Sequence, residues 1–221
     1  CIEEIATIRY KMGQSERVEE RAKEALAIYE ENGQVEGVAD CLKLLGNITS
    51  GRKEHAVAVE YYRRSADKYK EANNIHGQAN CHYNTGISYQ QMREYEKSVA
   101  AFQEAIGEYT QSSSVTGVGI ANMELGKTYR LMGDLAKSES ALVLAQNLLT
   151  KSQDLWRLGQ TEEALAQLRL AQGKKGEAMQ HYRNSITHHE QVKMTAEAAR
   201  LRRLLETMEK GTSSSGPARS E

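Results

Sequence analysis

Apolar and small side chains recur at steps of three and four residues along almost the whole chain, and residues 79–112 show the pattern clearly. The first stripe in this segment consists of Cys81, Thr85, Ser88, Tyr89 and Met92. After a joint at Arg93-Glu94, the second stripe consists of Tyr95, Val99, Phe102, Ile106 and Tyr109. Side chains at this spacing lie on one face of a helix, so the segment predicts two helices joined by a short turn.

The same pattern repeats every 40 residues without an insertion, as the spacing of Cys1, Cys41 and Cys81 first indicates. One series of positions is always glycine or alanine: Ala6, Gly46, Gly86, Gly126 and Ala166. Another is mostly large and apolar: Ala22, Tyr62, Phe102, Leu142 and Tyr182. A fixed period of this length predicts stacked helical repeats. Neither helix of a unit can bury its stripe alone, so neighbouring units must pack together.

The pattern predicts five helix pairs and one last helix, with a single proline, at Pro217, beyond all of them. The predicted helices span residues 1–12, 15–32, 35–50, 54–72, 76–92, 95–112, 115–132, 135–151, 155–172, 175–191 and 194–210. We therefore expect an all-α solenoid of about five repeats over residues 1–193. Residues 194–210 are expected to form a capping helix, and the Gly/Ser/Pro-containing residues 211–221 a disordered tail.

Two features of the repeat predict how each pair packs. The small residue of the first helix lets the second helix approach closely, and the large residue of the second helix fills the space opposite. The joint within each unit falls at Gly13, Lys53, Arg93, Gly133 and Gly173, and glycine suits the residue that follows a helix. The equivalent cysteines should lie too far apart for a disulfide and are expected to be small core residues.

In two successive units the residues resemble the tetratricopeptide repeat family. The residues that carry the resemblance are Gly86, Tyr89, Tyr95, Ser98, Phe102 and Ala105, followed by Gly126, Tyr129, Gly133, Ser138, Leu142 and Ala145. The 40-residue period is similar to the long-repeat Pins/LGN class, although the tryptophan of the usual motif is missing and Trp156 is the single tryptophan. The resemblance covers residues 1–210 and implies a protein-binding scaffold without catalytic activity.

Family geometry further implies that the first helices line a concave groove that holds a partner segment. By position, the candidate groove residues are Lys43, Asn47, Asn80, Tyr83, Asn84, Ile87, Gln90, Met123, Glu124, Lys127 and Arg130. The same stripe continues through Glu163 and Gln167 to Arg200, but the second to fourth units are expected to set specificity. Amides can grip a partner backbone, and Lys127 and Arg130 could hold a carboxylate. The expected partner is a protein segment with apolar anchors and an acidic residue.

Two other functions fit the same pattern. The chain could be an architectural part of a cytoskeletal or ciliary assembly that docks through its outer faces. It could also be a regulatory module that folds back on another part of a longer protein, since the chain begins without methionine. Substitutions in the groove and on the outer helices would separate these hypotheses.

Charge and composition exclude several other classes. The 29 Lys and Arg residues balance 30 Asp and Glu residues and form no basic block, which argues against nucleic-acid binding. No apolar run approaches the ~20 residues that a membrane-spanning helix needs. The three cysteines form no CxxC motif and suit a reducing compartment, so we expect a cytoplasmic location.

Two local patterns imitate functional sites. Residues 121–128 nearly match a phosphate-binding loop, but they lie inside a predicted helix with no strand before it. His181, His188, His189 and Glu190 share one predicted helix and could hold a metal, yet His189 occupies a large packing position and the other two histidines fit a surface. The sequence therefore predicts no catalytic residues, no cofactor and no metal site.

Overall fold

The computed structural model describes residues 15–213, which form ten helices and no strand. The helices are α2 (Ser15–Glu31), α3 (Val35–Gly51), α4 (His55–Glu71), α5 (Ile75–Gln91), α6 (Tyr95–Gln111), α7 (Val115–Met132), α8 (Leu135–Lys151), α9 (Leu155–Ala171), α10 (Lys175–Gln191) and α11 (Thr195–Ser213). The predicted all-α solenoid is confirmed. The predicted helix 1–12 and the joint at Gly13 lie outside the described residues. Helix α11 runs to Ser213, and the rest of the predicted tail also lies outside them.

Every joint between helices has the same backbone geometry. Each contains one residue with a positive φ, between 55° and 84°, and these residues recur every 20 positions: Gly33, Lys53, Asn73, Arg93, Ser113, Gly133, Gln153, Gly173 and Lys193. This left-handed residue ends the preceding helix and turns the chain into the next one. The predicted joints at Lys53, Arg93, Gly133 and Gly173 are confirmed. The 40-residue unit therefore consists of two half-units of equal length.

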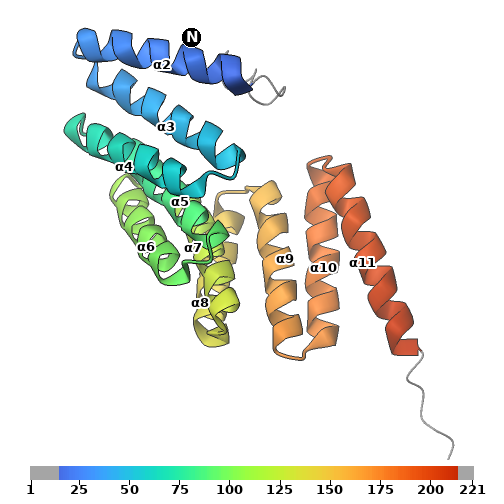
Figure 1. Cartoon of the computed structure of the whole chain (residues 1–221). Helices are drawn as coiled ribbons and strands as arrows, with labels where there is room; N and C mark the ends of the chain where they lie inside the picture. Colours follow the sequence, from blue (N-terminus) through green and yellow to red (C-terminus); the bar gives the residue numbers. More distant parts are fainter. Residues whose placement is uncertain (1–14, 214–221) are drawn as a thin grey trace, which may run out of the picture.

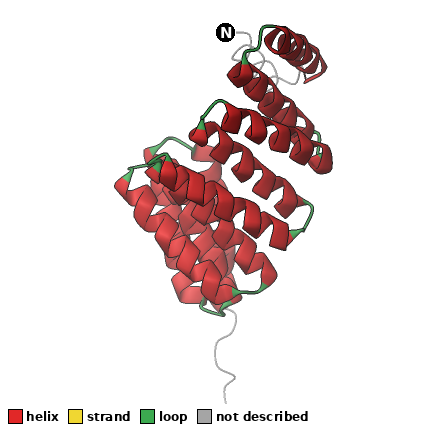
Figure 2. Ribbon diagram, turned by 90° about the vertical axis from the view of Figure 1, so that its left-hand side faces the viewer, coloured by secondary structure: helices red, strands yellow, loops and turns green. Residues whose placement is uncertain are grey.

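Consecutive helices pack side by side from α2 to α11, so that the chain forms one continuous stack (Figure 1). The odd-numbered helices are the first helices of the pairs, and α5 contacts α7 and α7 contacts α9 past the helix between them. The even-numbered helices are the second helices of the pairs, and only short loops separate consecutive helices (Figure 2). The core runs along the stack between the two rows, and Cys41 and Cys81 are fully buried in it, as predicted.

Glycine brings the two helices of a pair into close contact. A Cβ atom added at Gly46 would lie 2.6 Å from the Tyr62 ring, and one added at Gly86 would lie 2.6 Å from the Phe102 ring. The hydroxyl of Ser98 on α6 also donates a hydrogen bond of 2.9 Å to the Gly86 carbonyl on α5. The predicted pairing of a small residue with a large one is therefore confirmed.

This contact predicts opposite outcomes for two glycine substitutions. Gly86→Ala should lower the free energy of unfolding by about 1–3 kcal/mol, because the buried Phe102 ring cannot move away. Gly107→Ala is the matched control, since a Cβ atom there meets nothing within 4 Å on an exposed helical position. It should raise the free energy by about 0.5–1 kcal/mol through helix propensity. Urea unfolding followed by circular dichroism measures both, and equal effects would contradict the packing account.

Candidate partner-binding face

Four hydrogen bonds connect the first helices directly across one surface of the stack. We call this surface, lined by α3, α5, α7, α9 and α11, the first-helix face. The bonds are Asn84 Nδ2 to Asn47 Oδ1 (3.4 Å), Gln90 Nε2 to Thr128 Oγ1 (2.8 Å), Arg130 Nη2 to Gln167 Oε1 (2.8 Å) and Arg200 Nη2 to Glu163 Oε2 (2.6 Å). Each bond joins a first helix to the next one in the stack. Three of the bonds join exposed or half-buried side chains, whereas the α5–α7 bond ends on the buried Thr128 beneath the surface.

At the N-terminal end of the face, Lys43 and Asn47 are held by the second helix of their own unit. Lys43 Nζ lies 2.7 Å from Asp40 Oδ1 and also donates to the hydroxyl of Tyr69. Asn47 is exposed, and its Oδ1 accepts a 2.9 Å hydrogen bond from the Tyr62 hydroxyl. These bonds hold both side chains in place, and Asn47 remains exposed.

In the third unit, the predicted residues divide into a polar and an apolar group. Asn80 Oδ1 accepts a 2.6 Å hydrogen bond from the Tyr109 hydroxyl, while Asn84 is half-buried beside Asn47. The Tyr83 ring lies 5.9 Å from the Phe102 ring, and burial raises the pKa of Tyr83 above its ordinary value. Ile87 is half-buried against the Phe102 cluster. Tyr83 and Ile87 therefore belong partly to the core.

In the fourth unit, the structure places two of the predicted residues below the surface. Met123 is 1% exposed and packs in the core with Leu142 and Leu165. Glu124 is 8% exposed, and its Oε1 lies 2.8 Å from Lys127 Nζ. Lys127 is half-buried and remains at the surface, so the cation and not the carboxylate is presented there.

The polar row extends beyond the predicted set, which ends at Arg130. Gln167 links Arg130 to Glu163, because its Nε2 lies 3.4 Å from Glu163 Oε1, and Arg200 then pairs with Glu163. The fifth unit and α11 therefore share the face, although the sequence assigned specificity only to the second to fourth units. Gln167, Glu163 and Arg200 occupy repeat positions of the predicted set, so the repeat register alone could have identified them.

The face offers amides and weakly held charges to a partner. Arg130 donates to the neutral amide oxygen of Gln167, so a partner carboxylate can offer Arg130 a charged acceptor in place of a neutral one. Amide side chains can donate and accept at once, which matches an extended backbone or a polar side chain. The arrangement suits recognition of a protein segment.

The opposite side of two first helices carries buried polar networks that the sequence did not reveal. His82 Nδ1 on α5 lies 2.8 Å from Glu108 Oε2 on α6. Glu162 on α9 is 3% exposed and accepts hydrogen bonds from three residues: Gln146 (2.7 Å), His181 (2.7 Å) and Asn184 (3.3 Å). Burial alone would raise the pKa of Glu162, but the bonds from His181 and Gln146 and the His181 charge outweigh it and hold that pKa below its ordinary value.

The loop-like pattern of residues 121–128 and the histidines of α10 both have structural roles. Residues 121–128 lie inside α7, and Gly126 faces Leu142 at 2.6 Å from a would-be Cβ atom. His189 is 1% exposed, as its packing position predicted, whereas the expected surface residue His181 is half-buried and bonded to Glu162. Across residues 15–213, no cluster of three His, Cys, Asp or Glu side chains could hold a metal ion.

Half-buried His82 and buried His189 give pH dependences of stability with opposite signs. Burial disfavours protonation of His82, but the bond to Glu108 and the charges of Glu108 and Glu104 outweigh burial and raise the pKa of His82. Its stabilising contribution is therefore complete below the unfolded value of about 6.5 and is lost as pH rises through the folded pKa. Burial lowers the pKa of His189, so its contribution is lost as pH falls below about 6.5.

Two variants test these signs. The free energy of unfolding should differ between the native chain and His82→Gln more at pH 5.5 than at pH 8. His189→Tyr introduces the residue found at the equivalent positions Tyr69 and Tyr109. On acidification, the free energy of unfolding of the native chain should fall more than that of this variant. Urea unfolding at several pH values measures both. Parallel pH profiles for the native chain and both variants would refute the assignment.

Within the described part of the chain, no helix is both long and apolar enough to cross a membrane. No curated protein matches the chain. Among solved structures, the chain is similar to the apo form of RapI, with 17% identity and a TM-score of 0.68 over 87% of this chain and 83% of that one. It is also similar to the kinesin light chain TPR-like repeats of Podosopora anserina, with 14% identity and a TM-score of 0.68 over 86% and 94% of the two chains.

A further similar structure is the Rap conjugation gene regulator of plasmid pLS20 in complex with the Phr* peptide. The identity is 18% and the TM-score 0.74, and the match covers 93% of this chain but 57% of that one. Together these likenesses confirm the tetratricopeptide-like fold. The model of one family, described as soluble NSF attachment protein (SNAP), matches residues 5–125, which is more than half of the chain. The chain therefore belongs to the soluble NSF attachment protein family, within the tetratricopeptide-repeat superfamily.

Proposed function

We propose that the chain is a non-enzymatic, cytoplasmic adaptor that binds a segment of a partner protein along the first-helix face. The observation that supports the proposal is the series of side-chain hydrogen bonds that joins α3 to α5, α5 to α7, α7 to α9 and α9 to α11. All of these side chains are exposed or half-buried except Thr128, which is buried. A row of this length can contact an extended or helical segment at many points at once. A similar Rap structure holds the Phr* peptide, which supports a peptide as the kind of ligand.

The proposed contact residues are those of the predicted set that reach the surface. Asn47, Asn84, Lys127 and Arg130 would meet the partner first, with Lys43, Asn80 and Gln90 holding their neighbours in place. Tyr83 and Ile87 would offer the edges of apolar side chains, while Met123 and Glu124 would act only through the residues above them. The partner segment would carry an acidic residue for Lys127 or Arg130 and apolar anchors for the third unit.

We also propose that α11 caps the stack, as the sequence predicted for residues 194–210. In the four units before it, the small position of the first helix is Gly46, Gly86, Gly126 or Ala166, and a large side chain packs there. In α11 the equivalent position is Glu206, which is exposed. A charged side chain there would prevent another second helix from packing in register, which supports an end of the solenoid at α11.

The test is affinity capture from cytosol with the native chain and an Asn84→Ala, Lys127→Glu, Arg130→Glu variant. We expect specific partners to disappear, because the variant removes an amide and reverses two cations on the face. Binding should fall at least about tenfold if each lost charged contact contributes ~1.5–3 kcal/mol. Circular dichroism must show an unchanged helical signal.

The matched control reverses two charges away from the face, on α4. Arg63→Glu and Lys70→Glu change the net charge as much as the Lys127 and Arg130 substitutions do, on exposed positions of a second helix. The control should retain the partners. Loss of partners with the control but not with the first variant would favour docking through the outer helices, as in an architectural assembly.

A further inference from the structure

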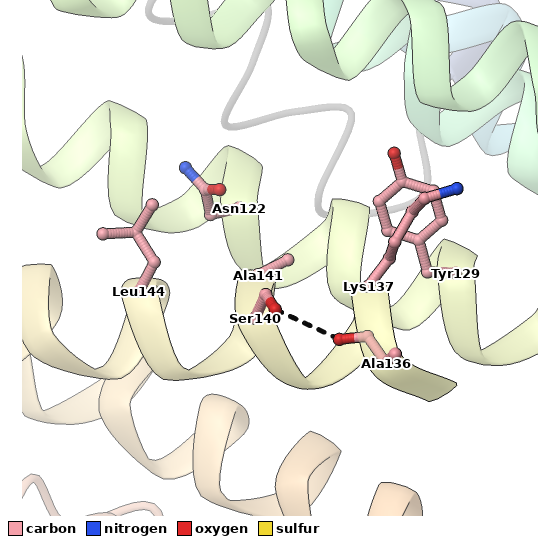
Figure 3. Close-up of a pocket in the computed structure, with 7 residues that line it drawn as sticks. All are labelled: Asn122, Tyr129, Ala136, Lys137, Ser140, Ala141 and Leu144. Carbon is pink, nitrogen blue, oxygen red and sulfur yellow. Dashed lines mark hydrogen bonds between the residues drawn. The ribbon is translucent and has the colours of Figure 1, made fainter. Parts of the chain in front are cut away.

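The outer side of the stack contains a pocket over α7 and beside α8. It lies between Asn122 and Tyr129 on α7 and residues 136–144 of α8, with a volume of about 380 Å³ (Figure 3). We call it the outer pocket. It is separate from the first-helix face, because its walls belong largely to a second helix.

The repeat register relates the pocket to the equivalent positions of other units. The floor residues one unit apart are His82, Asn122 and Glu162, and the neighbouring wall position is Ala101 over α5, Ala141 over α7 and His181 over α9. A further pocket lies at the equivalent positions of α2, where Arg21, Glu24, Ala25 and Ile28 line it. Over α9, His181 reaches across to Glu162 at 2.7 Å and fills the space. Ala141 cannot fill it, and the Asn122 amide donates only to the Val118 carbonyl of its own helix, at 2.8 Å.

The rim of the pocket is apolar where the equivalent positions of other units are polar. Val143 and Leu144 are 39% and 46% exposed. The corresponding pairs are Arg63 and Arg64 on α4, Gln103 and Glu104 on α6, and Arg183 and Asn184 on α10. Helix α8 thus exposes two large apolar side chains, of which Leu144 lines the pocket beside Ala141.

A cation marks the other end of the pocket. Lys137 Nζ lies 5.5 Å from the centre of the Tyr129 ring, and its side chain is 65% exposed in a surface pair with Asp134 at 2.9 Å. Lys137 and Leu144 are seven residues apart on α8, which is about two helical turns or ~10 Å. No carboxylate is among the residues that line the pocket, but Asp134 lies beside it in the pair with Lys137.

We propose that the outer pocket docks an amphipathic helix of a partner protein, independently of the first-helix face. The helix would insert a large apolar side chain beside Leu144 and Ala141, and would place a carboxylate about seven positions along its own sequence against Lys137. Lys137 defines the acidic end, where the partner carboxylate would replace Asp134 in an exposed pair, and the exposed Leu144 defines the apolar end. A helix fits because it would lie alongside α8 as the helices of this stack lie beside one another.

The test uses a displayed library of helical peptides of about 18 residues, selected for binding to the native chain. The closed variant, Ala141→His with Leu144→Asn, copies the residues that the fifth unit already accommodates at His181 and Asn184. Selected peptides should bind this variant at least about tenfold more weakly. They should carry an acidic residue seven positions from a large apolar one.

Leu144→Asn alone provides a second variant in case the double variant unfolds, because Leu144 is exposed. Val57→Asn, which removes another exposed apolar side chain from α4, is the matched control and should leave binding unchanged. Two results overturn the proposal: selected peptides that bind both pocket variants within about twofold of the native chain, or a selection that enriches no peptide. Concentration-dependent self-association of the native chain that the variants abolish would instead assign the pocket to a second copy.

Discussion

Phe102→Ala is expected to lower the free energy of unfolding by about 3–5 kcal/mol. Phe102 is fully buried and is the single phenylalanine of the chain. Its ring faces Gly86 and lies 5.9 Å from the Tyr83 ring, so alanine would leave a cavity between α5, α6 and α7. Urea unfolding monitored by circular dichroism measures the loss.

The control is Phe102→Leu, because the next unit already pairs a leucine with a glycine, Leu142 with Gly126. This variant should cost less than about 1.5–2 kcal/mol. A small effect of alanine, or equal effects of alanine and leucine, would show that the glycine–large residue contact does not hold the two helices of a pair together.

Removal of α11 should expose the last unit and cause aggregation. Leu201 and Ala198 of α11 are buried against Ala166, Tyr182 and Ile186. A chain that ends after Gln191 would leave this apolar surface in water, which is what a terminal helix of a repeat stack prevents. Size-exclusion chromatography and thermal melting measure the outcome.

Point substitutions make this second prediction quantitative. Leu201→Ala should destabilise the chain by about 2–5 kcal/mol, because the side chain is fully buried. Leu204→Ala, at a position that is 37% exposed, should change the free energy of unfolding by no more than ~0.5 kcal/mol. A monomeric truncated chain with unchanged melting would contradict the capping role of α11.

Most of the fold could be predicted from the repeat pattern. Helix pairs, joints and the pairing of Gly86 with Phe102 follow from spacing alone, because each unit must bury the same stripe against the next. Backbone geometry at Lys53 and Arg93 matched the joints even without glycine, since the register and not the residue type located them.

The candidate face was harder to predict, because spacing assigns a side chain to a helix face but not to a depth. Met123 and Tyr83 share one repeat position, yet Met123 is buried while Tyr83 is only partly so. The His181–Glu162 bond escaped notice because its residues are 19 apart on different helices. The outer pocket could have been found by comparing Leu144 with Glu104 and Asn184 in register.

The central claim is that a partner lies on the first-helix face, and site-specific photo-crosslinking tests it most directly. A photoreactive amino acid replaces Asn47, which is exposed on α3, or Gln180, which is exposed on α10, in otherwise native chains. Illumination with the captured partner should give a covalent adduct at position 47 and none at position 180. An adduct at position 180 without one at position 47 would contradict the account and place the partner on the outer helices.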